Sequence, residues 1–148
     1  MPLFRQTVHV LLDDSKEIEG MSYYFTKITS LGYEQALTRV QDELKKEGFG
    51  IITEIDVRET LKKKLNVDFR KYKILGACNP SFAHQALQIE SRIGTMLPCN
   101  VIVQEREDGQ TEVSAINPSE SMRTVANPNL ENIGSQVAAK LKSVIDRL

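Results

Sequence analysis

Along this chain, short runs with the composition of a strand alternate with segments whose hydrophobic residues recur at the spacing of a helix. Short runs of β-branched and aromatic residues predict strands at "YYFTKIT", "FGIITEI" and "YKILGAC". Each run is followed by apolar residues at helical spacing, most clearly at Tyr33, Ala36, Leu37, Val40 and Leu44. The pattern therefore predicts three strand–helix pairs in succession.

The predicted helices carry recognisable start and stop signals. Ser30 is placed to cap the first helix, and Gly48 supplies the left-handed residue that ends it. Asp56 and Glu59 have the spacing of a capping box at the second helix, whose apolar edge includes Leu65. We therefore expect both helices to begin and end close to these residues.

The second half of the chain predicts a hairpin between helices. Asn79-Pro80 is typical of a helix start, because proline lacks an amide that would be unbonded there anyway. "CNVIVQERE" and "QTEVSAI" flank Asp108-Gly109, a pair that favours a tight turn. Asn127-Pro128 introduces a last helix with an amphipathic stripe that runs to Leu148.

This order of elements predicts an α+β fold with a single, mainly antiparallel sheet and helices on one face. The closing hairpin argues against an all-parallel, doubly wound sheet. We expect residues 21–148 to form a single α+β domain, and residues 1–20 to be a leader or extension that the fold does not need.

Composition limits the class of protein without deciding its activity. The chain has 148 residues, 41% of them hydrophobic and 26% charged, which fits one globular domain. It has no long apolar run and no secretory signal, so a cytoplasmic protein without a membrane partner is expected. Two cysteines do not make a disulfide framework, and a net charge of −1 gives no general attraction to nucleic acid.

Positive charge is nevertheless concentrated between Arg58 and Lys73. The basic residues there are Arg58, Lys62, Lys63, Lys64, Arg70, Lys71 and Lys73, opposed by Glu59 and Asp68. A solvated helix face followed by a loop is the simplest interpretation of such a run. Nucleic-acid binding through this segment is the alternative.

Four segments in order resemble domain-of-unknown-function family 302, from about Tyr23 to the C-terminus. They are "GFGIITEIDVRETLKKKL", "ILGACNPSFAHQAL", "LPCNVIV" and "VSAINP". The resemblance implies a fold like that of the TATA-box-binding protein, with a curved antiparallel sheet and helices on one side. It also implies a homodimer, but it implies no known reaction.

The resemblance carries over a set of candidate site residues. Cys78 and Cys99 are the candidates for catalysis, and the candidates for ligand binding are Glu54, Asp56, Asn79, Pro80, Pro98 and Asn100.

The two cysteines have two interpretations. Cys78 directly precedes a helix start, a setting that favours the thiolate, and Cys99 would then be the resolving thiol. Their sulfur atoms could approach only if the two strands are antiparallel neighbours, because a bridge requires Cα atoms within about 7 Å. Alternatively, both cysteines pack as small apolar residues, with Asn79 as a helix cap.

Other candidate groups favour structural roles. Glu54 and Asp56 share a strand face and could divide acid and base roles, but capping and a nearby lysine explain them equally well. His9 lies in the leader, and His84 is expected on the surface of the third helix. No zinc spacing, phosphate-binding loop or dinucleotide fingerprint is present, so no metal and no cofactor are predicted.

Three functions therefore remain open. The first is a non-catalytic homodimeric module that binds a small ligand or a protein partner. The second is a thiol-dependent redox or sulfur-transfer protein that uses Cys78 with Cys99. The third is nucleic-acid binding through the basic segment, which the fold alone supports weakly. A large apolar pocket walled by charge-poor residues would favour the first, and two sulfurs close together beside a cleft would favour the second. The third requires steep salt-dependent binding to DNA or RNA.

Overall fold

The computed structural model describes residues 22–148 and contains one five-stranded sheet. Its strands are β1 (Tyr24–Thr29), β2 (Gly50–Asp56), β3 (Tyr72–Cys78), β4 (Cys99–Glu105) and β5 (Thr111–Ile116). Their order across the sheet is β1-β5-β4-β3-β2, and every neighbouring pair is antiparallel. The predicted α+β class with a single antiparallel sheet is confirmed.

Helices occupy the connections between strands and the C-terminus. The α-helices are α3 (Tyr33–Lys46), α4 (Val57–Leu65), α5 (Pro80–Ile89), α6 (Pro118–Ser121) and α7 (Pro128–Asp146). Two 3₁₀ segments, η1 (Ser91–Met96) and η2 (Met122–Val125), follow α5 and α6. The short α6 and η2 fill the stretch between the hairpin and the last helix, for which the sequence pattern predicted no element.

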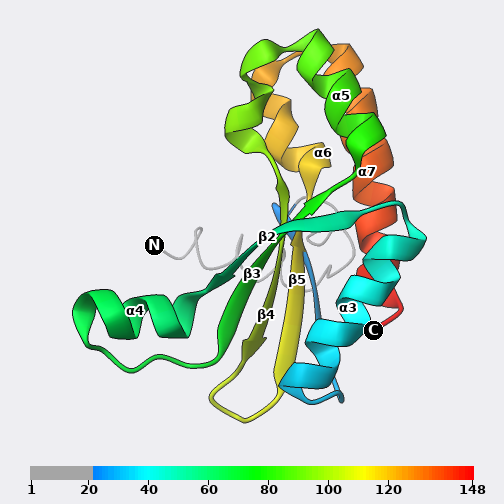
Figure 1. The fold of residues 1–148 in the computed structure, drawn as a ribbon. Helices are drawn as coiled ribbons and strands as arrows, with labels where there is room; N and C mark the ends of the chain where they lie inside the picture. The colour runs from blue at the N-terminus through cyan, green and yellow to red at the C-terminus, as the bar shows by residue number, and fades with distance from the viewer. Residues whose placement is uncertain (1–21) are drawn as a thin grey trace, which may run out of the picture.

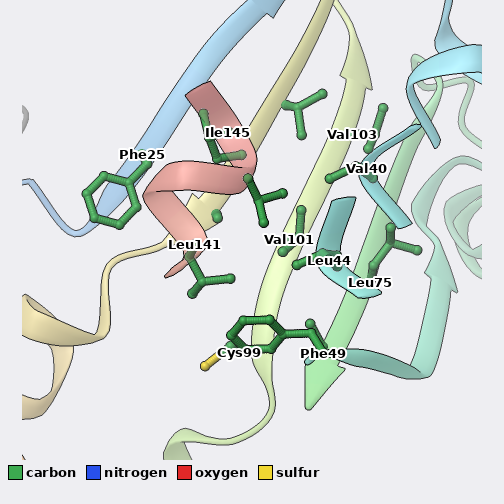
Figure 2. Packing of buried hydrophobic residues seen from close by; sticks show 14 of the residues in the cluster. Phe25, Val40, Leu44, Phe49, Leu75, Cys99, Val101, Val103, Leu141 and Ile145 are labelled. Carbon is green, nitrogen blue, oxygen red and sulfur yellow. The ribbon is translucent and has the colours of Figure 1, made fainter. Parts of the chain in front are cut away.

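The main core lies between one face of the sheet and two helices. Leu75, Val101, Val103 and Val113 alternate with outward-facing residues, and α3 and the second half of α7 pack over them (Figure 1). Figure 2 shows Leu75, Val101 and Val103 close together, with Cys99 at the margin of the drawn cluster. Because side chains alternate between the two faces along a strand, these residues all reach the same face of the sheet.

A carboxylate network closes this core at the C-terminus. Glu43 is buried on α3 and accepts hydrogen bonds from Arg147 at 2.6 Å and Lys46 at 2.9 Å. Arg39 lies 3.3 Å from the same carboxylate. These cations lower the pKa of Glu43 to about 2, so the group stays charged at the end of the helix layer.

A second, smaller group of helices lies beyond one end of the sheet. Figure 1 shows α5, η1, α6 and the first half of α7 together above the sheet, apart from α3. Their buried side chains form a separate cluster of Ala86, Ile93, Met122 and Leu130. The strand ends below this group and the helices above it border an apolar cavity that is partly open to solvent.

Several local signals behave as the sequence predicted. Gly48 has a φ of 85° after α3, and Gly109 has a φ of 83° in the β4–β5 turn. Asp56 accepts a hydrogen bond from the Glu59 amide at 2.9 Å at the start of α4. The residue before α3 is Gly32 rather than Ser30, so the predicted serine cap is wrong by two residues.

Candidate functional site

The apolar cavity at one end of the sheet has a volume of about 310 Å³. At this end β2 begins, β3 finishes and β4 begins, because Gly50 pairs with Cys78 and Ala77 pairs with Cys99. The strand ends contribute Phe49, Ile52, Ala77, Cys78 and Cys99 to the wall. The antiparallel register therefore brings both cysteines of the chain to one cavity.

Helix α5 forms another side of the cavity. It starts directly after β3, where Pro80 takes the first helical position and fixes the turn from strand to helix. Phe82, Ala83, Ala86 and Leu87 face the cavity from one side of this helix. Because two of these four residues are alanines, the helix side facing the cavity presents little bulk, and space remains between it and the strand ends.

The remaining wall comes from distant parts of the chain. Leu97 and Pro98 precede β4, Met122 lies in η2, and Ile133 and Val137 lie on α7. No charged side chain from residues 22–148 lines the cavity. A cavity with such a wall excludes ions and favours apolar molecules, because an ion loses its hydration there without compensation.

Asn79 contributes the one amide side chain of the described wall, and this amide already has a partner. Its Nδ2 atom donates to the carbonyl oxygen of Glu47 at 3.3 Å. A Cβ atom on Gly48 would lie 3.1 Å from this nitrogen, so the absence of a side chain at Gly48 leaves room for the Asn79 amide. Asn79 precedes α5 as predicted, but its side chain ties α5 to the end of α3 instead of capping the helix.

The two thiols are free and differ in exposure. Cys99 is buried and Cys78 is half-buried. Burial raises the pKa of Cys99 to about 11, with a smaller contribution from Cys78 nearby. The Cys99 thiol therefore remains protonated at neutral pH, whereas the Cys78 side chain is more accessible to a reagent.

The strands of the two cysteines are antiparallel neighbours, the arrangement in which an approach of the sulfurs was expected to be possible. However, the partner of Cys99 is Ala77, so Cys78 is offset by one residue. Side chains alternate between faces along a strand, which directs Cys78 and Cys99 to opposite sides of the sheet. Both reach the cavity because it lies at the sheet's end, and both are free thiols.

The candidate residues from the sequence divide into two groups. Cys78, Asn79, Pro98 and Cys99 all line the cavity. Pro80 is exposed at the start of α5 and does not line it, although it fixes the direction of the helix that does.

Three candidate residues lie away from the cavity. Asn100 is exposed and pairs with Gly76. Glu54 and Asp56 lie toward the other end of β2. There Glu54 contacts Lys73 at 2.7 Å, and the carboxylate of Asp56 caps α4. Both carboxylates are thus already engaged in structural contacts.

The first part of the basic segment, Arg58 to Lys64, lies on α4, which projects from the sheet (Figure 1), whereas Lys73 lies on β3. No residue of α4 is fully buried, and of its predicted apolar edge Leu61 is half-buried and Leu65 is 66% exposed. Lys62 pairs with Asp68 at 3.1 Å and Lys63 with Glu59 at 2.9 Å. Part of the positive charge is thereby neutralised locally, as expected for a solvated helix face.

The remaining candidates from the sequence do not assemble a site. His84 is exposed on α5, as predicted, and His9 lies outside the described residues. Among residues 22–148, no three side chains of histidine, cysteine, aspartate or glutamate gather closely enough to hold a metal ion. In the same part of the chain, no helix is long and apolar enough to cross a membrane.

Comparison with known proteins agrees with this architecture. Residues 25–148 match the model of the family described as "Domain of unknown function DUF302". The chain belongs to the DUF302 family. The resemblance inferred from the four sequence segments is therefore confirmed.

Two relatives of this DUF302 chain cover most of its length. An uncharacterized protein of Aquifex aeolicus (strain VF5) is 25% identical over 125 residues, which are 82% of this chain and 81% of that protein. The crystal structure of an uncharacterized conserved DUF302 protein from Bacillus stearothermophilus has a TM-score of 0.79 and 29% identity. That match covers 84% of this chain and 97% of the other. The crystal structure supports the fold, and both relatives are described as uncharacterized.

Sequence reasoning missed most of the cavity wall. Phe49, Phe82, Met122, Ile133 and Val137 come from four separate segments, and each fits the ordinary apolar pattern of its own surroundings. A weak signal was available in the two alanines of "SFAHQAL", because small residues on the inward side of a helix leave room nearby. Local periodicity predicts that a residue faces inward but not whether that interior is filled.

Proposed function

We propose that this DUF302 protein binds a small apolar molecule in the cavity between α5 and the end of the sheet. The observation that carries the proposal is the wall itself, which joins apolar side chains from strands, helices and loops without a charged group from the described residues. Binding pockets for small molecules are typically apolar and have volumes of about 300–1,000 Å³. This cavity lies at the lower end of that range.

The volume indicates the size of the ligand. An engineered cavity of about 150 Å³ is known to hold benzene, so about 310 Å³ suits two fused rings or a chain of about ten carbons. Burying about 200 Å² of apolar ligand surface contributes about 5 kcal/mol. That free energy corresponds to a dissociation constant on the order of 0.1–1 mM for a ligand that gains nothing else.

The amide of Asn79 gives the wall room for at most a small polar group on the ligand. One N–H of its Nδ2 atom donates to the Glu47 carbonyl, and an amide side chain has one further N–H and an acceptor oxygen. Selectivity then comes from shape and from the sulfur atoms of Cys78, Cys99 and Met122, which are polarizable contacts for aromatic rings and alkyl chains.

The test is a titration with 1-naphthol, followed in methyl NMR spectra of the protein. Methyl groups of Leu87, Met122, Ile133 and Val137 line the cavity and should shift together, while that of Leu44 in the main core should not. Shifts confined to methyl groups that do not line the cavity, such as those of Leu44, or no shifts up to the highest soluble concentration of 1-naphthol, would contradict the proposal.

A pair of variants makes the test specific. Ala83→Leu places three extra carbons into the cavity and should abolish the shifts. Ala139→Leu adds the same atoms at an exposed position of α7 and should leave them unchanged. Equal binding by the two variants would place the naphthol elsewhere on the molecule.

A further inference from the structure

The cavity that we propose as a ligand site also contains reactive chemistry. Apart from the amide of Asn79, the only side chains of its described wall with an exchangeable proton are the thiols of Cys78 and Cys99. A molecule that binds there is held by apolar contacts and lies near a soft nucleophile. A reaction at these thiols rests on the proposed function, because it requires that an apolar molecule enters the cavity.

The two thiols are not equivalent toward such a molecule. Cys99 is only 8% exposed, and burial keeps its thiol protonated at neutral pH. Cys78 is half-buried, and it is the last residue of β3 before the chain turns into α5. Since the strand register directs their side chains to opposite sides of the sheet, Cys78 can react without pairing with Cys99.

We propose that Cys78 captures apolar α,β-unsaturated aldehydes that enter the cavity, by conjugate addition of its thiol. The wall selects an alkyl chain of about ten carbons or fewer by size, and the sulfur selects the soft carbon of the electrophile. An electrophile with a charged group is excluded by the same wall.

The step balances without an oxidant, a reductant or a metal. The sulfur of Cys78 forms a bond to the β-carbon of the aldehyde, and the carbon–carbon π bond breaks. The electron pair moves to the α-carbon, which takes up one proton, and the sulfur loses the thiol proton to solvent. The product is a thioether that retains its aldehyde group.

Holding the aldehyde beside the sulfur should accelerate addition beyond ordinary thiol reactivity. The experiment treats the native protein with trans-2-nonenal, which is apolar, and with acrylamide, which is small and polar. Modification at each residue is measured by peptide mass spectrometry, and the nonenal rate is divided by the acrylamide rate. We expect this ratio at Cys78 to be about tenfold higher in the native protein than in urea.

Variants show whether the cavity causes the selectivity. Ala83→Leu keeps Cys78 but fills the cavity, so the ratio should fall to its value in urea. Ala139→Leu should retain the native ratio, and Cys78→Ser should remove the adduct without transferring it to Cys99.

Three results would overturn this inference. They are a ratio that is equal in the native and unfolded protein, a ratio that Ala83→Leu leaves unchanged, and an adduct that forms first at Cys99 or at lysines. If 1-naphthol shifts the cavity methyl groups while one of these results holds, the capture fails and apolar binding stands. If naphthol does not shift them, the proposed function itself has failed.

Discussion

The two ends of the sheet are packed differently, although the same helix, α7, covers both. The C-terminal half of α7 packs together with α3 on the sheet and forms a continuous core. Leu44, Val101 and Leu141 are fully buried there. Toward its N-terminus, α7 meets α5, and a cavity of about 310 Å³ remains. Because this cavity is partly open to solvent, the side chains around it lack packing contacts that the other end of the sheet makes.

The comparison grades apolar side chains by how completely they are surrounded, because some wall residues, such as Phe49 and Ile133, also belong to the main core. The apolar side chains at the two ends look alike in sequence, but those in the core touch neighbours on all sides. Those around the cavity have one side open, so removing atoms from them leaves fewer contacts to lose. Substitutions at the two ends should therefore have different effects.

The largest difference is expected from leucine truncation. Leu141→Ala should lower the free energy of unfolding by about 3 kcal/mol, because a fully buried side chain leaves a new cavity. Leu87→Ala, at the cavity wall and 44% exposed, should cost less than about 1 kcal/mol. Urea denaturation of both variants measures the difference, and equal costs would mean that the two ends are packed alike.

A smaller effect is expected at glycines of neighbouring strands. A Cβ atom on Gly76 would collide with Oγ1 of Thr53 and lie 2.7 Å from Cγ of Pro98, so Gly76→Ala should cost about 1–3 kcal/mol. Adding Thr53→Ala should recover part of this loss in a double-mutant cycle. Gly50→Ala, which meets no atom within 4 Å, is the matched control and should be nearly neutral.

Replacing an alanine by leucine should change the free energy of unfolding in opposite directions at the two ends of the sheet. Ala83→Leu fills space at the cavity and should raise the free energy of unfolding by about 0.5–1 kcal/mol. Ala36→Leu, at a fully buried position of α3, should lower it by about 1–3 kcal/mol through overpacking. Thermal unfolding of both variants decides the point, and a loss at Ala83 would show that no usable space exists there.

The smallest effect concerns acid stability at the packed end. The pKa of Glu43 is about 2 in the folded protein, below the value of about 4.3 expected when unfolded. Its contribution is therefore fully present above about pH 4.3 and is lost as the pH falls toward 2. Glu43→Gln should flatten the dependence of the urea midpoint on pH in this window.

Glu131→Gln, at an exposed acid of α7, is the control for this measurement and should keep the wild-type profile. A wild-type slope in Glu43→Gln would assign the acid response to other carboxylates. In the wild-type protein, the slope of the urea midpoint against pH should persist at high salt. Salt screens a close ion pair less than distant charges, and Glu43 lies 2.6 Å from Arg147.

The sequence predicted the elements well because their signals are local. The helical spacing from Tyr33 to Leu44, the turn at Asp108-Gly109 and the helix start at Asn127-Pro128 all appear where expected. Each depends on residues within a few positions of one another, and caps and turns act at that range. The α+β class followed from their order.

The cavity could be predicted only in part. Cys78, Asn79, Pro98 and Cys99 were identified through the family resemblance, and all four line the cavity. Ile133 fits the amphipathic stripe of the last helix as an ordinary core position, yet it lies at the cavity wall. Contacts between α7 and α5 depend on how the whole chain packs, and no local pattern records the space left beside them.

The helix α4 has a consequence for protein engineering. Asp56 and Lys73 are partners in the β2–β3 register, so the chain leaves the sheet and re-enters it at one place. Residues 57–71 connect these two strand ends, and the helix in this connection has no buried residue. This segment is thus a suitable site for inserting a foreign sequence. A reporter or another helix can replace α4 there without entering the core or the cavity.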